Sequence, residues 1–214
     1  CMIRAAILWV SLSLCGISAF AQTSISPILK GIEDRYNATK TLETQFAQVF
    51  SFGPRQRTES GTLYLRKPGK MRWEYREPAN KLFVSDGKFV YLYSPSTNVA
   101  ERTPFKATDD LRAPLAFLLG RLNFQKDFRR FTLKPVGANY WITAEPRSEK
   151  APYSLVAFLV TPGFQILEVE VTGVDQAVNR FRFQNEKRNL PIAASKFEFQ
   201  PPQGSRGVDR SEER

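Results

Sequence analysis

The stretch SGTLYLRKPGKMRWEY, at residues 60–75, contains two short runs in which apolar and polar residues alternate. In the second run Met71, Trp73 and Tyr75 fall on one side, and charged residues fall on the other. A period of two with one wet face is typical of a β-strand. The Pro-Gly dipeptide at residues 68–69 favours a reversal of the chain between the runs. The stretch therefore predicts two adjacent antiparallel strands that share an apolar face.

The same alternation continues along most of the chain, as far as a KFEF run at residues 196–199, with short connections of turn residues. Asp86-Gly87 is the strongest hairpin signal because glycine accepts the positive φ that such a turn requires. Pro162-Gly163 supports another reversal. Consecutive hairpins predict an antiparallel meander, which tends toward a barrel or a strongly curved sheet.

Two segments have helical rather than strand-like patterns. Ser26-Pro27 supplies a cap and a first-turn proline, and an apolar stripe from Ile25 to Tyr36 follows. The second segment, DDLRAPLAFLLGRL at residues 109–122, predicts a short apolar helix that stops at Gly120. Its apolar side chains are Leu115, Phe117, Leu118 and Leu119. Such a helix fits over the mouth or the concave face of the sheet, or it plugs a barrel end as ordinary core.

The start of the chain resembles a secretory signal. An apolar run follows Arg4, and Ala19-Phe20-Ala21 has the small-x-small arrangement that precedes cleavage. We expect residues 1–21 to be a cleaved signal peptide that sends the protein to the periplasm. The apolar run is shorter than the ~20 residues that a membrane-spanning helix needs. The alternative is acylation at Cys15, although the bulky Leu14 before it argues against a lipoprotein signal.

Absent residue types exclude several kinds of enzyme. The chain has no histidine, and its two cysteines both precede residue 22. Serine–histidine triads, histidine bases, thiolate nucleophiles and the usual zinc sites are therefore excluded from the expected mature chain. Glu168 and Glu170 share one strand face, but a solvated face explains them better than a catalytic pair. We expect a binding protein without enzymatic activity, cofactor or metal.

The charge of the chain also limits its partners. The formal net charge is +10. For an exported protein this excess indicates anionic lipid head groups or an acidic partner protein rather than nucleic acid. Simple solubility explains the charge equally well.

The sequence feature that indicates binding is the number of large apolar side chains on strands whose opposite face is polar. The side chains in such alternating contexts are Phe46, Leu63, Leu65, Met71, Trp73, Tyr75, Phe83, Tyr91, Phe181, Phe183, Phe197 and Phe199, and the first seven are the candidate cavity residues. Such residues suit the core of a filled barrel and equally the lining of a cavity for an apolar ligand. Composition alone does not separate the two.

Four stretches give the chain a resemblance to the LolA family of periplasmic lipoprotein carriers. They are SGTLYLRKPGKMRWEY (60–75), LFVSDGKFVYLYSP (82–95), APLAFLLG (113–120) and KFEFQPPQG (196–204). The resemblance implies a mainly β fold: a single antiparallel, unclosed half-barrel of about eleven or twelve strands, covered by the N-terminal helix and a short lid helix. This domain would occupy residues 22–204, and residues 205–214 would form a flexible polar tail.

The resemblance also implies a function and partners. The cavity would take the acyl chains of lipoproteins, with Met71 and Trp73 at the family's aromatic positions. A basic residue before a proline, here Lys67, would bond to the lid and keep it shut, while Arg66 should point outward by strand parity. A lipoprotein-releasing ABC transporter of the inner membrane would load the carrier, expected to be a monomer, and the receptor LolB would unload it. Two alternatives on the same fold are a LolB-like anchored acceptor and a periplasmic sensor of lipid or lipoprotein.

Overall fold

The computed structural model describes residues 24–105 and 121–210. The helices are α1 (Ile25–Asn37) and α2 (Phe124–Asp127), with a 3-10 helix η3 (Ala194–Phe197). The strands are β1 (Thr41–Phe52), β2 (Arg55–Arg66), β3 (Lys70–Glu77), β4 (Leu82–Asp86), β5 (Phe89–Ser94), β6 (Val99–Pro104), β7 (Phe128–Val136), β8 (Asn139–Pro146), β9 (Tyr153–Val160), β10 (Ile166–Gly173), β11 (Val178–Arg188) and β12 (Arg206–Asp209).

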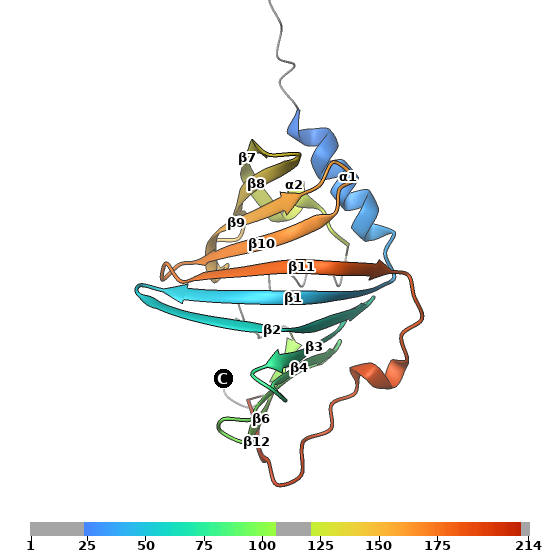
Figure 1. The fold of residues 1–214 in the computed structure, drawn as a ribbon, viewed down its shortest axis with the longest axis vertical. Coiled ribbons are helices and arrows are strands. Elements are labelled where there is room, and N and C mark those ends of the chain that lie inside the picture. Colours follow the sequence, from blue (N-terminus) through green and yellow to red (C-terminus); the bar gives the residue numbers. More distant parts are fainter. Residues whose placement is uncertain (1–23, 106–120, 211–214) are drawn as a thin grey trace, which may run out of the picture.

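All twelve strands form one sheet in the order β12-β6-β5-β4-β3-β2-β1-β11-β10-β9-β8-β7 (Figure 1). Two meanders, β1–β6 and β7–β11, meet where β1 pairs with β11. The two ends of the sheet, β12 and β7, do not pair with each other, so the barrel is unclosed. The predicted fold class is confirmed, with one parallel pair, β12 and β6, in an otherwise antiparallel sheet.

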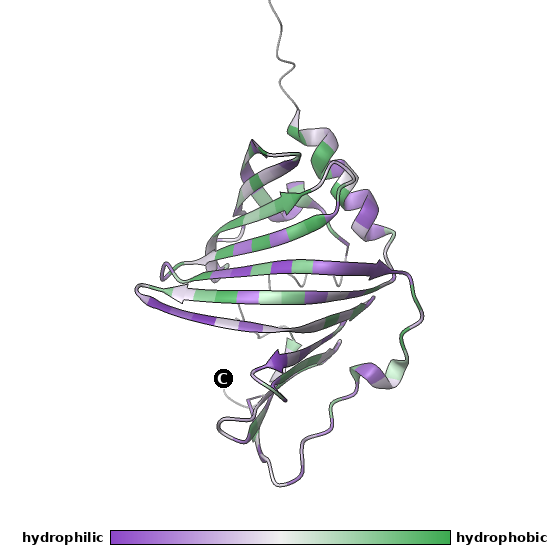
Figure 2. Ribbon diagram, viewed as in Figure 1, coloured by the Kyte–Doolittle hydropathy of each residue, from purple (hydrophilic) through white to green (hydrophobic). Residues whose placement is uncertain are grey.

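The sheet has two chemically different faces because side chains alternate along each strand. Figure 2 shows this as alternating hydrophilic and hydrophobic bands along β1, β10 and β11. The face that carries Phe46, Trp73 and Phe181 belongs to one large apolar cluster with the buried residues of α1. We call it the inner face. The opposite, outer face carries ion pairs such as that between Arg72 and Glu74.

Helix α1 covers part of the inner face. Its buried residues are Ile28, Leu29, Ile32 and Tyr36, as the apolar stripe predicted. The helix begins one residue before Ser26, and Ser24 holds the cap position without a side-chain hydrogen bond. The amphipathic pattern therefore sets the orientation of the helix, and side-chain capping adds nothing here.

The predicted reversals are present at 68–69 and 86–87. Gly69 and Gly87 have φ values of 73° and 96°. The carboxylate of Asp86 accepts the backbone N–H groups of Lys88 and Phe89 at 2.7 and 2.8 Å. This Asx-type turn joins β4 to β5.

Gly61 sits at an irregularity in the pairing of β2 with β3. The register shifts between Ser60 and Gly61, which is the pattern of a β-bulge. A Cβ atom at Gly61 would lie 2.0 Å from the carbonyl oxygen of Glu74. The backbones of the two strands approach so closely that only glycine fits.

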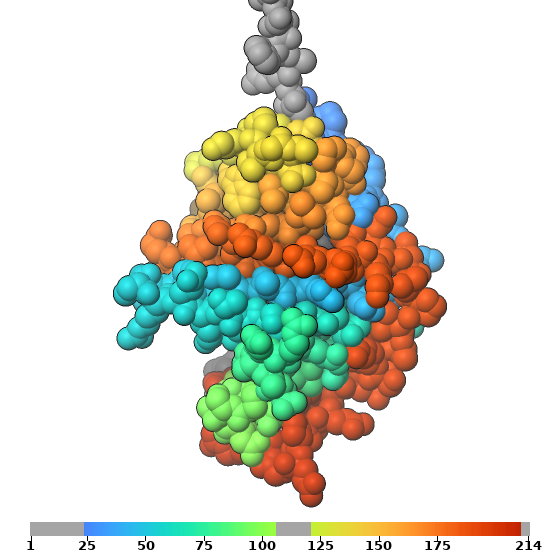
Figure 3. Space-filling model, in the orientation of Figure 1, coloured from blue at the N-terminus to red at the C-terminus, as the bar shows by residue number. Residues whose placement is uncertain are grey.

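Three features near the C-terminus and in the middle of the chain differ from the sequence-based predictions. The KFEF run at 196–199 is not a strand: residues Ala194–Phe197 form η3. The segment lies on the outer face of the sheet, where Phe197 is buried. Arg72 holds it there by donating hydrogen bonds to the carbonyl oxygens of Lys196 and Glu198. Figure 3 shows this C-terminal part, in red, packed beside β2–β4.

The other two differences concern short elements. Residues 206–209, expected in a flexible tail, form β12, which adds to the edge of β6 and is supported by ion pairs from Arg102 to Asp209 and from Arg210 to Glu101. Helix α2 was not predicted because four residues are too few to show a helical period.

Candidate functional site

The inner face of β1–β4 brings together all seven candidate residues. Each has a relative exposure of 5% or less, and all belong to one cluster: Phe46, Leu63, Leu65, Met71, Trp73, Tyr75 and Phe83. Cross-strand pairing explains the grouping, since Trp73 lies opposite Leu63 on β2 and Phe83 on β4. Four strands thus build one continuous apolar surface.

Aromatic rings interlock at the centre of this surface. The Trp73 ring lies 4.6 Å from that of Phe46 and 5.4 Å from that of Phe181, measured between centroids. Phe46 also meets Tyr75 edge-on at 5.1 Å. Phe181 was not among the seven candidates, although its alternation with Phe183 on β11 is the same kind of signal. It extends the surface across the junction of the two meanders.

The indole nitrogen of Trp73 has no hydrogen-bond partner. Trp73 is completely buried, and within residues 24–105 and 121–210 its Nε1 and the Nε of Arg35 are the two buried side-chain nitrogens that lack one. Arg35 is nevertheless bonded through its Nη2 to Glu186 at 2.5 Å. Trp73 has a single polar atom, so its whole polar capacity is unused.

A small polar network lies farther along the same face. Gln48 Nε2 donates to Asn179 Oδ1 at 3.0 Å, and the Tyr75 hydroxyl donates to Gln48 Oε1 at 3.3 Å. Gln48 and Asn179 are both buried. Sequence analysis missed Gln48, which has the same strand parity as Phe46 and therefore shares its face. The inner face is thus mainly apolar, and this group of hydrogen-bonded polar side chains is part of it.

Lys67 follows β2 and reaches α1 rather than solvent. Its Nζ donates to the carbonyl oxygen of Tyr36 at 2.7 Å, at the last turn of the helix. A cation there is favoured because the helix dipole leaves the C-terminal carbonyls partly negative. Burial lowers the pKa of the Lys67 amine from its ordinary value, because desolvation disfavours the charged form.

Arg66 points away from Lys67, as strand parity predicted. Its Nη1 donates to the carbonyl of Ile192, in the segment that covers the outer face, at 3.3 Å. The lid residues Leu115, Phe117, Leu118 and Leu119 lie outside the described residues. A bond between Lys67 and the lid therefore stays a prediction.

Tyr36 locks the end of α1 onto the second meander. Its hydroxyl donates to Glu186 on β11 at 2.9 Å and accepts the backbone N–H of Ile166 on β10 at 2.9 Å. Burial raises the pKa of Tyr36 strongly, and the nearby Glu186 carboxylate raises it further. The backbone of Tyr36 thus meets Lys67 while its side chain meets β10 and β11.

A groove of about 830 Å³ opens beside Lys67. Its lining is Lys30, Glu33, Asp34, Asn37, Lys40, Lys67, Pro68, Arg121, Leu122 and Asn123. Asn37 bonds both backbone groups of Leu122, donating to its carbonyl at 2.9 Å and accepting its N–H at 2.8 Å. Glu33 accepts the N–H of Phe124 at 2.7 Å. Helix α1 therefore also anchors the chain just after residue 120.

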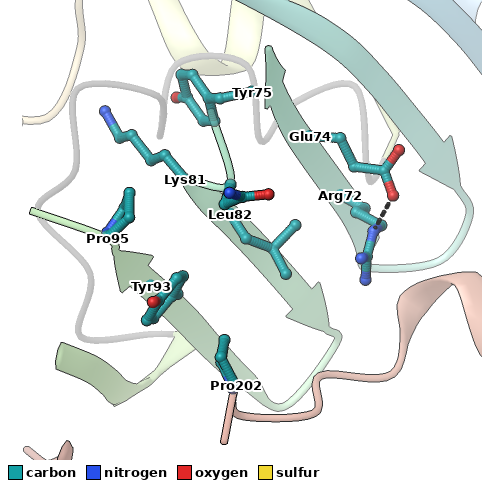
Figure 4. A pocket seen from close by; sticks show the side chains of 9 residues that line it. Arg72, Glu74, Tyr75, Lys81, Leu82, Tyr93, Pro95 and Pro202 are labelled. Atoms are coloured by element: carbon teal, nitrogen blue, oxygen red, sulfur yellow. Dashed lines mark hydrogen bonds and ion pairs between the residues drawn. The ribbon is translucent and has the colours of Figure 1, made fainter. Parts of the chain in front are cut away.

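The lining of this groove is mostly charged and polar, and two other hollows are no better suited to an acyl chain. An apolar void of about 20 Å³ between Tyr36, Leu63 and Phe183 is far too small for one. A groove of about 480 Å³ has a mixed lining that includes Arg72, Glu74 and Tyr93 (Figure 4). Its Arg72–Glu74 ion pair, at 2.7 Å, makes that groove a polar surface.

No group of three histidine, cysteine or carboxylate residues that could bind a metal ion occurs in the described part of the chain. No helix within the described ranges has the length and apolar character needed to cross a membrane.

Comparison with known proteins gives the family. The family model described as "Outer membrane lipoprotein carrier protein LolA" matches residues 37–200. This chain belongs to the LolA family. An outer-membrane lipoprotein carrier protein of Bordetella avium is 30% identical over 88% of this chain and 93% of its own length. One from Chromobacterium violaceum is 27% identical over 88% of this chain and 89% of its own length.

A solved structure supports the fold. An uncharacterized conserved protein from Thermus thermophilus matches with a TM-score of 0.52 at 14% identity, over 88% of this chain and 100% of its own. The LolA family match spans both meanders, from the end of α1 to the segment after η3. The family resemblance expected from the sequence is confirmed, and the relatives are named as carriers rather than as enzymes.

Proposed function

We propose that this protein is a periplasmic carrier that binds the acyl chains of lipoproteins on its inner face and ferries them from the inner to the outer membrane. The observation that carries the proposal is the continuous apolar surface of β1–β4, on which all seven candidate residues are buried together in a LolA-family chain. Loading by an inner-membrane ABC transporter and unloading to LolB belong to the same proposal.

The energetics explain why such a carrier needs two states. An acyl chain of about sixteen carbons gains on the order of ten kcal/mol on leaving water, at ~0.8 kcal/mol per methylene. A permanently open, fitted pocket would therefore retain its cargo. If the empty protein closes its inner face on itself, part of that gain is returned when cargo leaves.

Lys67 is the residue we propose as the latch of the closed state. Its bond to the Tyr36 carbonyl ties the end of β2 to α1, beside the groove that borders residues 121–123. If this bond forms only in the closed state, it favours release of the cargo. Removing it should leave binding intact and slow the hand-over.

The carrier role is tested by adding purified mature protein to spheroplasts and probing the medium for soluble lipoprotein. We expect release of lipoprotein in a complex with the protein. An absence of released lipoprotein, together with an empty protein in native mass spectrometry, would refute the carrier role. The same spectra give the oligomeric state and the mature N-terminus, expected at Gln22; an acylated Cys15 would instead support an anchored acceptor.

The latch is tested with Lys67→Leu. We expect cargo to bind as in the wild type and to pass to acceptor membranes carrying LolB at least about tenfold more slowly, since a charged hydrogen bond contributes about 1.5–3 kcal/mol. Lys88→Leu is the matched control because it removes the same charge from the exposed β4–β5 turn. Transfer by Lys67→Leu at the rate of this control would show that Lys67 is not the latch.

A further inference from the structure

The unpaired indole N–H of Trp73 is unusual for a protein interior. More than nine in ten buried polar groups have a hydrogen-bond partner, so each exception requires an explanation. Trp73 has a relative exposure of 0%, and its Nε1 has no partner. In this state of the protein the donor is both buried and unused.

The ring contacts and cross-strand neighbours of Trp73 in the described part of the chain are apolar. The ring is packed by Phe46 and Phe181, and its cross-strand neighbours are Leu63 and Phe83. All four side chains are hydrocarbon. The indole is therefore held in an apolar setting by its neighbours on four strands.

The buried Gln48–Asn179 pair farther along the face already has hydrogen-bond donors for its oxygens. The side-chain oxygen of Gln48 accepts from Tyr75, and that of Asn179 accepts from Gln48. Each oxygen therefore already has a donor, and Trp73 bonds to neither of them. The donor is thus available to a ligand that reaches the inner face.

A fatty-acyl chain brings the complementary group. It is apolar except at the carbonyl that links it to its carrier molecule, and a carbonyl that enters an apolar site without a hydrogen bond is strongly disfavoured. We propose that Trp73 Nε1–H donates a hydrogen bond to the ester carbonyl oxygen of an O-acylated glyceryl group. This inference rests on the proposed carrier function and names the chemistry that the inner face recognises beyond the hydrocarbon chain.

The arrangement makes Trp73 a specificity-determining residue. The hydrocarbon contacts of the inner face do not depend on how a chain is linked, whereas the indole donor distinguishes an ester from an ether. Cargo must part the side chains that now cover Trp73, so the hydrogen bond forms only in the loaded protein. It then fixes how deeply the glyceryl end enters the site.

The test compares two probes on the full mature protein by isothermal titration calorimetry. One is a short peptide whose N-terminal cysteine carries a dipalmitoylglyceryl group, and the other is its dihexadecyl ether analogue without carbonyls. We expect the wild type to bind the ester about fivefold to tenfold more tightly, the range of one net hydrogen bond. Equal binding of the two probes would overturn the inference while leaving the carrier proposal intact.

Variants assign the preference to one atom. Trp73→benzothienylalanine keeps the shape of the ring and removes the N–H, so it should bind both probes alike. Trp141→Phe is the matched control, because Trp141 lies on β8 with parity opposite to the buried Ile142. It should retain the ester preference. An ester preference that persists without the Trp73 N–H would contradict the assignment.

A measurement on the unaltered protein avoids any folding defect of the variants. With ¹⁵N-labelled tryptophan, the indole proton of Trp73 should move downfield on addition of the ester probe and much less with the ether probe. Identical shifts with both probes would overturn the inference. Binding of neither probe would overturn the carrier proposal itself, and this inference with it.

Discussion

Tyr36 on α1 and Trp73 on β3 are both buried aromatic residues with one polar atom, yet their hydrogen bonding is opposite. The Tyr36 hydroxyl is used twice, toward Glu186 and toward Ile166, whereas the Trp73 indole is not used. Satisfied buried networks make a structure rigid, and an unsatisfied donor lowers its stability. The contrast fits a fixed joint at the end of α1 and agrees with the proposal that the inner face of β3 receives a ligand.

The largest effect is expected at the fixed joint. Tyr36→Phe leaves the Ile166 amide and the Glu186 carboxylate without this partner and should lower the free energy of unfolding by about 2 kcal/mol, since stranded buried groups cost about 1–3 kcal/mol. Urea unfolding at pH 7 measures it. A change no larger than that of an exposed substitution would mean that α1 is not held by this hydroxyl.

The same joint predicts a pH dependence. The pKa of Tyr36 in the folded protein is raised above its ordinary value of 10.0, by burial first and by Glu186 second. The contribution of the Tyr36 hydroxyl to the free energy of unfolding is fully present below pH 10. It is lost as the pH rises toward the pKa of the folded state, because Tyr36 ionises first in the unfolded chain. The stability deficit of Tyr36→Phe should therefore narrow above pH 10. A deficit that widens there would contradict the assignment.

An intermediate effect is expected within the inner face, at its patch of hydrogen-bonded polar side chains. Gln48→Leu removes two hydrogen bonds, from Tyr75 and to Asn179, and should cost about 1 kcal/mol net, because replacing the buried amide by hydrocarbon offsets part of the loss. Its thermal unfolding should be compared with that of Gln56→Leu, an exposed glutamine on β2. If the two variants have the same midpoint temperature of unfolding, the polar patch does not stabilise the fold.

The smallest effect is expected where the N–H is unused. Trp73→benzothienylalanine should change the unfolding free energy of the empty protein by less than about 0.5 kcal/mol, or raise it, because no hydrogen bond is lost and no donor stays buried. The chemical denaturation midpoint is the readout. A loss of about 1 kcal/mol or more would show that the indole has a partner in the empty protein, and the contrast with Tyr36 would disappear.

The features that depend on local strand structure could be predicted from the sequence. Period-two alternation places Met71, Trp73 and Tyr75 on one face, and strand parity separates Lys67 from Arg66; the structure agrees on both points. These predictions succeed because neighbouring strands are joined by short turns, so pairing follows chain order. Family resemblance then supplied the unclosed barrel, which alternation alone could not distinguish from a closed one.

The contacts between residues far apart in the sequence could not be predicted. The Tyr36–Glu186 hydrogen bond joins residues 150 positions apart. The periodicity of apolar residues predicts local structure and does not show which distant residues meet. The alternating KFEF run misled for a related reason: Phe197 is buried against the outer face by a segment that lacks strand pairing there. That the Trp73 donor is unused depends on what surrounds it in three dimensions, so sequence could name the residue but not its state.

The bulge at Gly61 constrains the wall of the barrel. Any other residue would put a carbon atom 2.0 Å from the backbone oxygen of Glu74, so β2 and β3 would have to separate beside the pairing of Leu63 with Trp73. Side chains of the inner face can be exchanged for others of similar volume without moving the backbone, whereas a side chain at this position cannot be accommodated unless the two strands move apart. The shape of the barrel wall therefore depends on a residue that has no side chain, and the lining of the inner face can vary independently of it.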